Sequence, residues 1–129
     1  MKKLIASGLL LVCFFSYTAL AMNTLFQAPT MNIEGTASSI VSKLDKSLSL
    51  TAVQKPKLLN IVTGYLRQKV ALQSLQQSNE KAYTTKMNSI QNGLHAKLKP
   101  LFTLTQYTEY LGLKPKSYDE TDVLSQLYY

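Results

Sequence analysis

The sequence has very few residues that could carry redox or metal chemistry. Of its 129 residues one is cysteine, one is histidine and none is tryptophan. Cys13 lies near the N-terminus, so the rest of the chain can form no disulfide and offers no thiol for catalysis. No other ligand stands at a spacing from His95 that would complete the three or four protein ligands of a zinc site. We therefore expect no cofactor and no metal, and we interpret His95 as a surface or half-buried side chain.

Catalytic signatures are absent as well. The sequence contains no recognisable set of serine, histidine and carboxylate, no phosphate loop and no nucleotide-binding fingerprint. Its only acidic cluster, Asp119, Glu120 and Asp122, lacks the glycine and the ligand spacing of a calcium loop. Acidic residues are favoured in the first turn of a helix, because the helix dipole stabilises negative charge there. These observations argue against an enzyme and favour a closing helix at the acidic cluster.

The N-terminus has the architecture of a cleavable secretory signal. Lys2 and Lys3 form a basic start, an apolar run covers residues 9–15, and residues 19–21 give the small-x-small pattern that signal peptidase recognises. An uncleaved membrane anchor is the alternative, but polar residues shorten the apolar stretch below the ~20 residues that a spanning helix needs. The sequence therefore predicts removal of residues 1–21, secretion from the cytoplasm, and no stable membrane insertion after cleavage.

The net charge is positive but dispersed. Lys2 and Lys3 precede residue 22, so residues 22–129 keep 12 of the 14 lysine and arginine residues against 7 acidic ones, a net charge of +5. The basic residues stand singly, without the cluster typical of a nucleic-acid binder, and we expect no nucleic-acid partner. A single domain of this size leaves much apolar surface uncovered, so a second copy of the chain or a bound client would help to bury it.

Hydrophobic periodicity predicts an all-α fold. Residues 22–35 contain Pro29 and Gly35 and are interpreted as a leader or linker, followed by a helical domain over residues 36–113. Apolar residues between Thr36 and Leu48 recur at helical spacing and predict a first short helix. The C-terminal residues 114–129 are expected to form a tail that contains one short helix.

The middle of the domain holds two further apolar stripes. They run from Leu58 to Leu75 and from Tyr83 to Leu98, with Ser78-Asn79 as the one break between them. A turn at this break would give an antiparallel hairpin, whereas a continuous helix would extend for ~70 Å at 1.5 Å per residue. We favour the hairpin, which predicts a small bundle of one long helical hairpin with short flanking helices.

Two helix starts carry the same capping signal. The Thr51 hydroxyl can accept from a free amide of the first turn, and Gln54 can reach back to the amide of Thr51. Thr103 and Gln106 repeat this capping box 52 residues later. The helix after the second box is expected to end at Gly112 in the left-handed conformation.

The two boxes, LTAVQ at residues 50–54 and FTLTQ at residues 102–106, resemble the motif of the LTxxQ family of small periplasmic helical proteins, the family of Spy and CpxP. The resemblance covers about residues 49–113, roughly half of the chain. It implies a cradle-like dimer of long bent helices in the bacterial periplasm, which binds unfolded or misfolded proteins without ATP. The matching residues, to which we assign a structural role as helix caps, are Leu50, Thr51, Gln54, Phe102, Thr103 and Gln106.

We expect on these grounds a chaperone-like protein, acting as a holdase or as a modulator of the envelope stress response. The alternative is a structural or regulatory adaptor that binds one specific envelope protein through the same helical face. The sequence predicts a client-binding surface of amphipathic and basic residues, since aromatic residues are frequent at interfaces. They are Tyr65, Leu66, Lys69, Tyr83, Lys86 and Met87. The opposing interpretation is that Tyr65, Tyr83, Tyr107 and Tyr110 are residues at the edge of the core.

Overall fold

The computed structural model describes residues 32–129, which form an all-α domain. Its helices are α1 (Ile33–Leu48), α2 (Gln54–Ser78), α3 (Glu80–Leu101), α4 (Leu104–Gly112) and α5 (Ser125–Tyr128). None of these helices is long and apolar enough to span a membrane. The predicted signal over residues 1–21 and the linker as far as residue 31 lie outside the described residues. The all-α prediction is confirmed, and so is the long hairpin, formed by α2 and α3.

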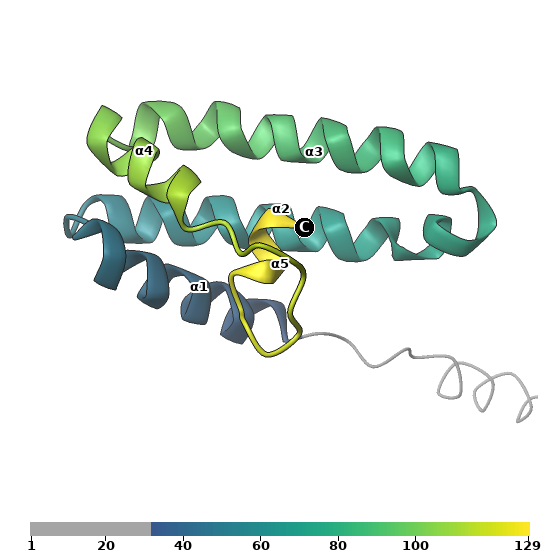
Figure 1. Cartoon of the computed structure of the whole chain (residues 1–129), viewed down its shortest axis with the longest axis horizontal. Helices are drawn as coiled ribbons and strands as arrows, with labels where there is room; N and C mark the ends of the chain where they lie inside the picture. Colours follow the sequence, from purple (N-terminus) through teal and green to yellow (C-terminus); the bar gives the residue numbers. More distant parts are fainter. Residues whose placement is uncertain (1–31) are drawn as a thin grey trace, which may run out of the picture. The chain divides into compact units, whose positions relative to one another are not determined.

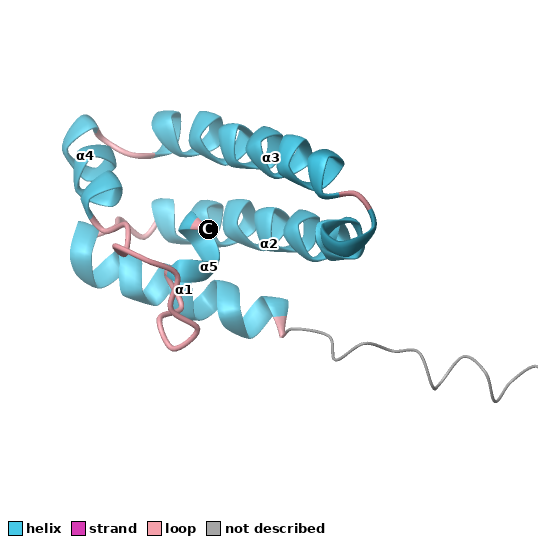
Figure 2. Ribbon diagram, turned by 45° about the vertical axis from the view of Figure 1, so that its right-hand side comes forward, coloured by secondary structure: helices cyan, strands magenta, loops and turns pink. Residues whose placement is uncertain are grey.

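The long helix α2 lies between α1 and α3, and it packs on both (Figure 1). The chain reverses direction after each of the first three helices, so the α1–α2 connection and the α3–α4 connection lie at the same end of the bundle (Figure 2). There α4 contacts both α1 and α3, while the short α5 packs on α2. This arrangement brings the two predicted capping boxes together at one end.

A single residue, Asn79, ends the first helix of the hairpin and caps the second. The backbone amide of Asn79 donates to Leu75 O at 2.8 Å and closes α2. The side chain of the same residue accepts from the backbone amide of Ala82 at 3.1 Å and caps α3. Asparagine is a preferred N-cap because its short side chain can satisfy a free amide of the first turn. The break at Ser78-Asn79 is therefore a turn between two helices, as we favoured.

Helix α1 begins three residues earlier than the sequence predicted. Its N-cap is Asn32, whose Oδ1 accepts from the amide of Gly35 at 3.0 Å. The prediction treated Gly35 as a breaker, but a single glycine costs a helix only about 1 kcal/mol relative to alanine. The cap at Asn32 and the apolar stripe that follows outweigh that cost.

The expected left-handed ending of α4 is wrong. Gly112 is the last residue of α4, and the C-cap is Leu113, whose amide donates to Glu109 O and Tyr110 O, both at 3.1 Å. No glycine among residues 32–129 has a positive φ. The left-handed residue is instead Ser49, the C-cap of α1, with φ 53°. The chain needs this conformation there because it must turn sharply into the first box.

One apolar core runs through the whole domain. It collects buried residues from each helix and from the connections, including Leu50 and Phe102, which directly precede the two cap threonines. The most enclosed side chains, with at most 1% of their surface exposed, include Ile40, Leu44, Leu58, Leu66, Leu98, Tyr110 and Leu127. Leu127 belongs to α5, so the C-terminal tail contributes to the core and does not simply trail from it.

Candidate functional site

The second capping box forms as predicted at the start of α4. The Thr103 hydroxyl oxygen accepts from the amide of Gln106 at 3.2 Å. In return, the Gln106 Oε1 accepts from the amide of Thr103 at 3.0 Å. Thr103 itself has the extended backbone of an N-cap, and α4 starts at the next residue. Two of the free amides at this helix start are thereby satisfied.

The first box makes the same two hydrogen bonds. Thr51 Oγ1 accepts from the amide of Gln54 at 3.2 Å, and Gln54 Oε1 accepts from the amide of Thr51 at 3.0 Å. Here residues 51–53 form a turn, and regular helix begins only at Gln54. Pro56 falls in the first turn of α2, where a backbone amide has no partner within the helix, so its missing donor costs little.

The two boxes are joined through the side-chain amides of their glutamines. Gln54 Nε2 donates to Gln106 Oε1 at 2.8 Å, and Gln106 Nε2 donates to Gln54 Oε1 at 3.1 Å. Each amide nitrogen uses its second hydrogen on a helix end of the opposite connection: Gln54 donates to Leu101 O at 2.9 Å and Gln106 to Leu48 O at 3.3 Å. Every donor and acceptor of the two amides is therefore occupied.

This reciprocal pattern makes the two connections near-equivalent halves of one junction. Each half consists of the last residue or residues of one helix, a buried apolar residue, a threonine cap and a glutamine. The sequence predicts the two caps but not the contact between the glutamines. The only signal was the repetition of the pentapeptide, since local periodicity carries no information on contacts between residues 52 positions apart.

The six residues predicted as a client-binding surface do not form one open patch in this conformation. Tyr65, Leu66 and Met87 are buried, with 4%, 0% and 7% of their surfaces exposed. Lys69 and Tyr83 are half-buried and Lys86 is exposed. Contact between these residues and a client stays a prediction, and for the three buried residues it requires a change in the packing around them.

Two of the remaining tyrosines, Tyr107 and Tyr110, form a cluster with His95. The ring of Tyr110 is fully buried and lies 6.0 Å from the rings of both His95 and Tyr107, measured between ring centroids. His95 Nδ1 is 3.1 Å from the Tyr107 hydroxyl. Burial lowers the pKa of His95, and the nearby Lys99 and Lys114 lower it further. The half-buried His95 thus packs among aromatic rings, in surroundings that favour its neutral form.

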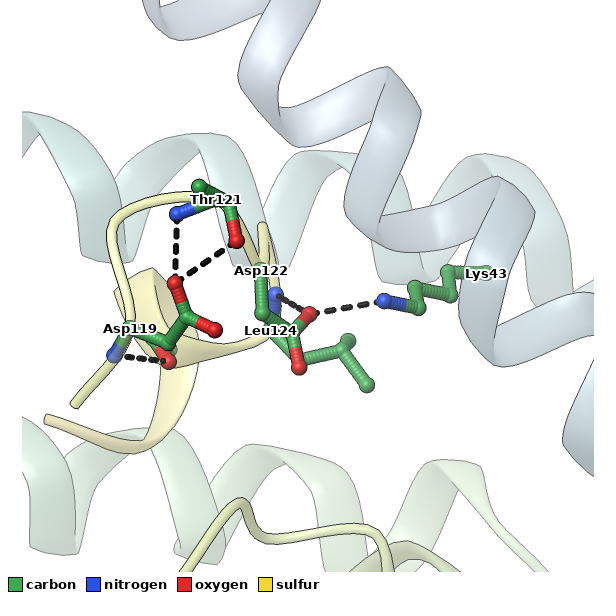
Figure 3. Close-up of polar contacts among 6 residues, drawn as sticks. Lys43, Asp119, Thr121, Asp122 and Leu124 are labelled. Atoms are coloured by element: carbon green, nitrogen blue, oxygen red, sulfur yellow. Dashed lines mark hydrogen bonds and ion pairs between the residues drawn. The ribbon is translucent and has the colours of Figure 1, made fainter. Parts of the chain in front are cut away.

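The acidic cluster stabilises turns in the C-terminal tail (Figure 3). Asp119 accepts from the amide and the hydroxyl of Thr121, at 2.8 and 2.7 Å. Asp122 accepts from the amide of Leu124 at 3.0 Å and pairs with Lys43 of α1 at 2.7 Å. The hydrogen bonds from Thr121 and from Lys43 are the main reasons why the pKa values of Asp119 and Asp122 are lowered. These residues precede α5. The prediction that they lie in the first turn of the closing helix is therefore wrong.

The surface charge is unevenly compensated. The ion pairs found in residues 32–129 all involve α1, through Glu34, Lys43 and Asp45. Helix α3 carries four exposed lysines, Lys81, Lys86, Lys97 and Lys99, and only one acidic residue, Glu80. Its outer surface is therefore positive. Within the described part of the chain, no three histidine, cysteine or carboxylate side chains lie close enough to hold a metal ion.

A small recess lies between α2 and α3. Its volume is about 110 Å³, and it is lined by residues that include Ile61, Tyr65, Ile90 and Lys97. This volume is below the ~300 Å³ at which small-molecule sites begin.

Comparison of the chain with protein-family models, with curated proteins and with solved structures finds no match. The most elaborate arrangement of polar groups in the domain is thus the glutamine junction, and its role is structural.

Proposed function

We propose that this protein is an exported, ATP-independent chaperone-like protein that binds unfolded or misfolded proteins in the bacterial periplasm. It acts as a holdase or as a modulator of the envelope stress response. The protein carries no chemistry of its own in this role. Its work is to present a helical surface to polypeptides that would otherwise aggregate.

The observation that carries the proposal is the use of both pentapeptides in one junction. The resemblance to the LTxxQ family was based on the sequence pattern alone, and any capped helix can produce one such pentapeptide. Here both glutamines close their boxes and bind each other, at 2.8 and 3.1 Å. The motif residues thus have a shared structural purpose, which supports reading the two pentapeptides as one motif of that family.

The exposed surface has the mixture of charge and apolar groups that suits a loosely specific binder. The lysines of α3 supply dispersed positive charge. Three large apolar side chains are exposed at or near the boxes: Val53, Leu104 and Leu111, with 65%, 85% and 49% of their surfaces accessible. Leu104 and Leu111 are seven positions apart on α4 and lie on the same side of that helix. An unfolded chain offers apolar side chains and carboxylates together, so both kinds of group would contribute to its binding.

Suppression of aggregation tests the proposal. A disulfide-bonded client is reduced with dithiothreitol, and light scattering is followed with increasing amounts of the exported protein. Since Cys13 is the only cysteine and lies within the predicted signal, residues 1–21, the reductant leaves the tested protein unchanged. Scattering should fall in proportion to the protein added, with no nucleotide present. Unchanged scattering at several-fold molar excess contradicts the holdase function.

Capture from envelope extract separates the proposal from the adaptor alternative. A holdase should retain many proteins, each weakly and only when they are unfolded. A single partner held in stoichiometric amount would favour the adaptor. A variant with Lys81, Lys86, Lys97 and Lys99 all changed to glutamine serves as a control, because loss of many weak partners is expected when the charge of α3 is removed.

A further inference from the structure

The C-terminal tail, residues 114–129, folds largely on itself. The amide of Asp119 donates to Ser125 Oγ at 3.0 Å, and the side chain of Asp119 holds Thr121. At the other end, the hydroxyl of Tyr129 donates to Pro115 O at 2.6 Å. These bonds close within the tail (Figure 3 shows those around Asp119). The polar groups of the tail are therefore satisfied in large part by the tail itself.

Polar contacts attach the tail to the body on two sides. Asp122 pairs with Lys43 of α1 at 2.7 Å, with 29% and 49% of the two side chains exposed. The carbonyl oxygen of Gln126 accepts from Lys69 Nζ of α2 at 3.0 Å. An exposed ion pair such as that between Lys43 and Asp122 contributes little to stability. These contacts therefore position the tail without holding it firmly.

The apolar attachment of the tail lies within residues 123–128. Leu124 and Leu127 are buried, with 5% and 1% of their surfaces exposed, and both belong to the core cluster. The ring of Tyr128 stacks on that of Tyr110, with 5.0 Å between their centroids, and its hydroxyl donates to the carbonyl oxygen of Tyr110. The tail is thus seated by two leucines three positions apart and an adjoining tyrosine.

One of the predicted client-binding residues of α2, Lys69, lies at the seat of the tail. Lys69 touches the tail directly, and Tyr65 and Leu66 lie one helical turn before it on the same side of α2. All three belong to the six residues selected from the sequence. Lys69 is half-buried, and this burial lowers the pKa of its ammonium group.

We infer that residues 114–129 occupy the client-binding surface on α2 and α4, and that this surface, when the tail lifts, takes short apolar segments of unfolded proteins that resemble Leu124–Tyr128. The inference rests on the proposed function and specifies both its site and its regulation. The ligand class is a pair of aliphatic side chains three positions apart followed by an aromatic one. Lys69 would donate to a backbone carbonyl of the client, as it does to Gln126 O.

The contacts within the rest of the domain make this exchange feasible. Lifting the tail leaves α1 to α4 and the glutamine junction connected through contacts of their own. Local opening of one segment requires less free energy than global unfolding. A client that binds only the open form increases the population of that form. The apparent affinity of the client is its intrinsic affinity multiplied by the fraction of chains that are open.

A clamp on the tail in the full chain provides the first test. Lys43→Cys and Asp122→Cys are introduced together with Cys13→Ser, so that the two new thiols are the only ones. A short bismaleimide then ties the tail to α1, and the same variant capped with a monofunctional maleimide is the matched control. The clamped protein should need about tenfold more chain than the control to halve client scattering.

Loosening the tail should have the opposite effect. Leu127→Ala removes a fully buried side chain from the seat, which should raise the open fraction and the suppression of scattering at least about tenfold. Asp122→Asn loses only the exposed ion pair and should raise suppression by up to about fivefold. Glu120→Gln removes an equal charge two positions away at a residue with no partner in the described structure, and should change nothing. Far-UV circular dichroism confirms that each variant keeps its helices.

The outcomes separate the inference from the proposed function. If clamped, capped and loosened proteins all suppress aggregation equally, the client binds elsewhere and the inference is overturned while the holdase function stands. If none of them suppresses aggregation, the proposed function fails. A labelled peptide with the sequence VLSQLYY should bind the Leu127→Ala protein and not the clamped one; equal binding to both would also overturn the inference.

Discussion

Replacing Gln106 by glutamate separates helix capping from glutamine pairing, because a carboxylate can perform the first task but not the second. Glutamate is as good as glutamine in a capping box, and its charge is favourable in the first turn of a helix, by about 0.3–1 kcal/mol. It cannot donate, however. The variant loses the hydrogen bonds from Gln106 Nε2 to Gln54 Oε1 and to Leu48 O, which are 3.1 and 3.3 Å long.

The net effect follows from these opposing contributions. Two lost hydrogen bonds cost about 1–3 kcal/mol in total, and a carboxylate oxygen now faces Gln54 Oε1. After the gain from the helix dipole, we expect the free energy of unfolding to fall by about 1–2 kcal/mol at pH 7. For a domain of this size, the midpoint of thermal unfolding should fall by about 5–15 °C. If only capping mattered, Gln106→Glu would be neutral or stabilising, so the two accounts differ in sign.

Urea unfolding followed by circular dichroism measures the difference. Gln73→Glu, on the exposed side of α2, is the control and should change stability by less than about 0.5 kcal/mol. A cycle with Gln54→Ala, Gln106→Ala and the double variant should give a coupling energy of about 1–2 kcal/mol. A stable Gln106→Glu protein, together with additive alanine variants, would refute the idea that the two boxes act as one junction.

Three further predictions follow from single residues. Ser49→Gly should stabilise the domain by up to about 1 kcal/mol in thermal unfolding, because φ is 53° at this position and glycine adopts such values without strain. Tyr110→Phe should cost nothing in urea unfolding, since the buried Tyr110 hydroxyl has no partner, whereas Tyr128→Phe should cost about 1 kcal/mol, since its hydroxyl donates to the carbonyl oxygen of Tyr110. Because the folded state lowers the pKa of His95, stability should be complete above about pH 6.5 and decline as the pH falls below it, where the unfolded chain takes up a proton first. In His95→Gln this decline just below about pH 6.5 should disappear; an unchanged slope would contradict the assignment.

Local signals in the sequence were sufficient for most of the helices. The capping boxes and the asparagine at position 79 act within one helical turn, and their side chains satisfy amides three positions away. Such signals can be recognised in the sequence because they do not depend on contacts with distant residues. Where two local signals competed, the prediction was less accurate: Gly35 was given too much weight against Asn32, and Gly112 was assigned a left-handed conformation that the structure places at Ser49.

The contacts between distant segments could not be read in the same way. The pairing of Gln54 with Gln106, and the seating of the tail on Lys43 and Lys69, join residues that are 52 to 79 positions apart. A tail of mixed composition shows no period that would indicate a buried face. For the same reason the sequence does not show that Tyr65 and Leu66 of the predicted surface are buried.

Binding of an unfolded chain is the property from which the rest of the functional account follows. The most direct measurement is the fluorescence anisotropy of a labelled client, reduced and alkylated so that it cannot fold, titrated with residues 22–129 of the protein in the absence of ATP. We predict a saturable rise in anisotropy for the unfolded client and none for the same client in its native form. A flat titration with the unfolded client, or an equal rise with the native one, would contradict the proposed function.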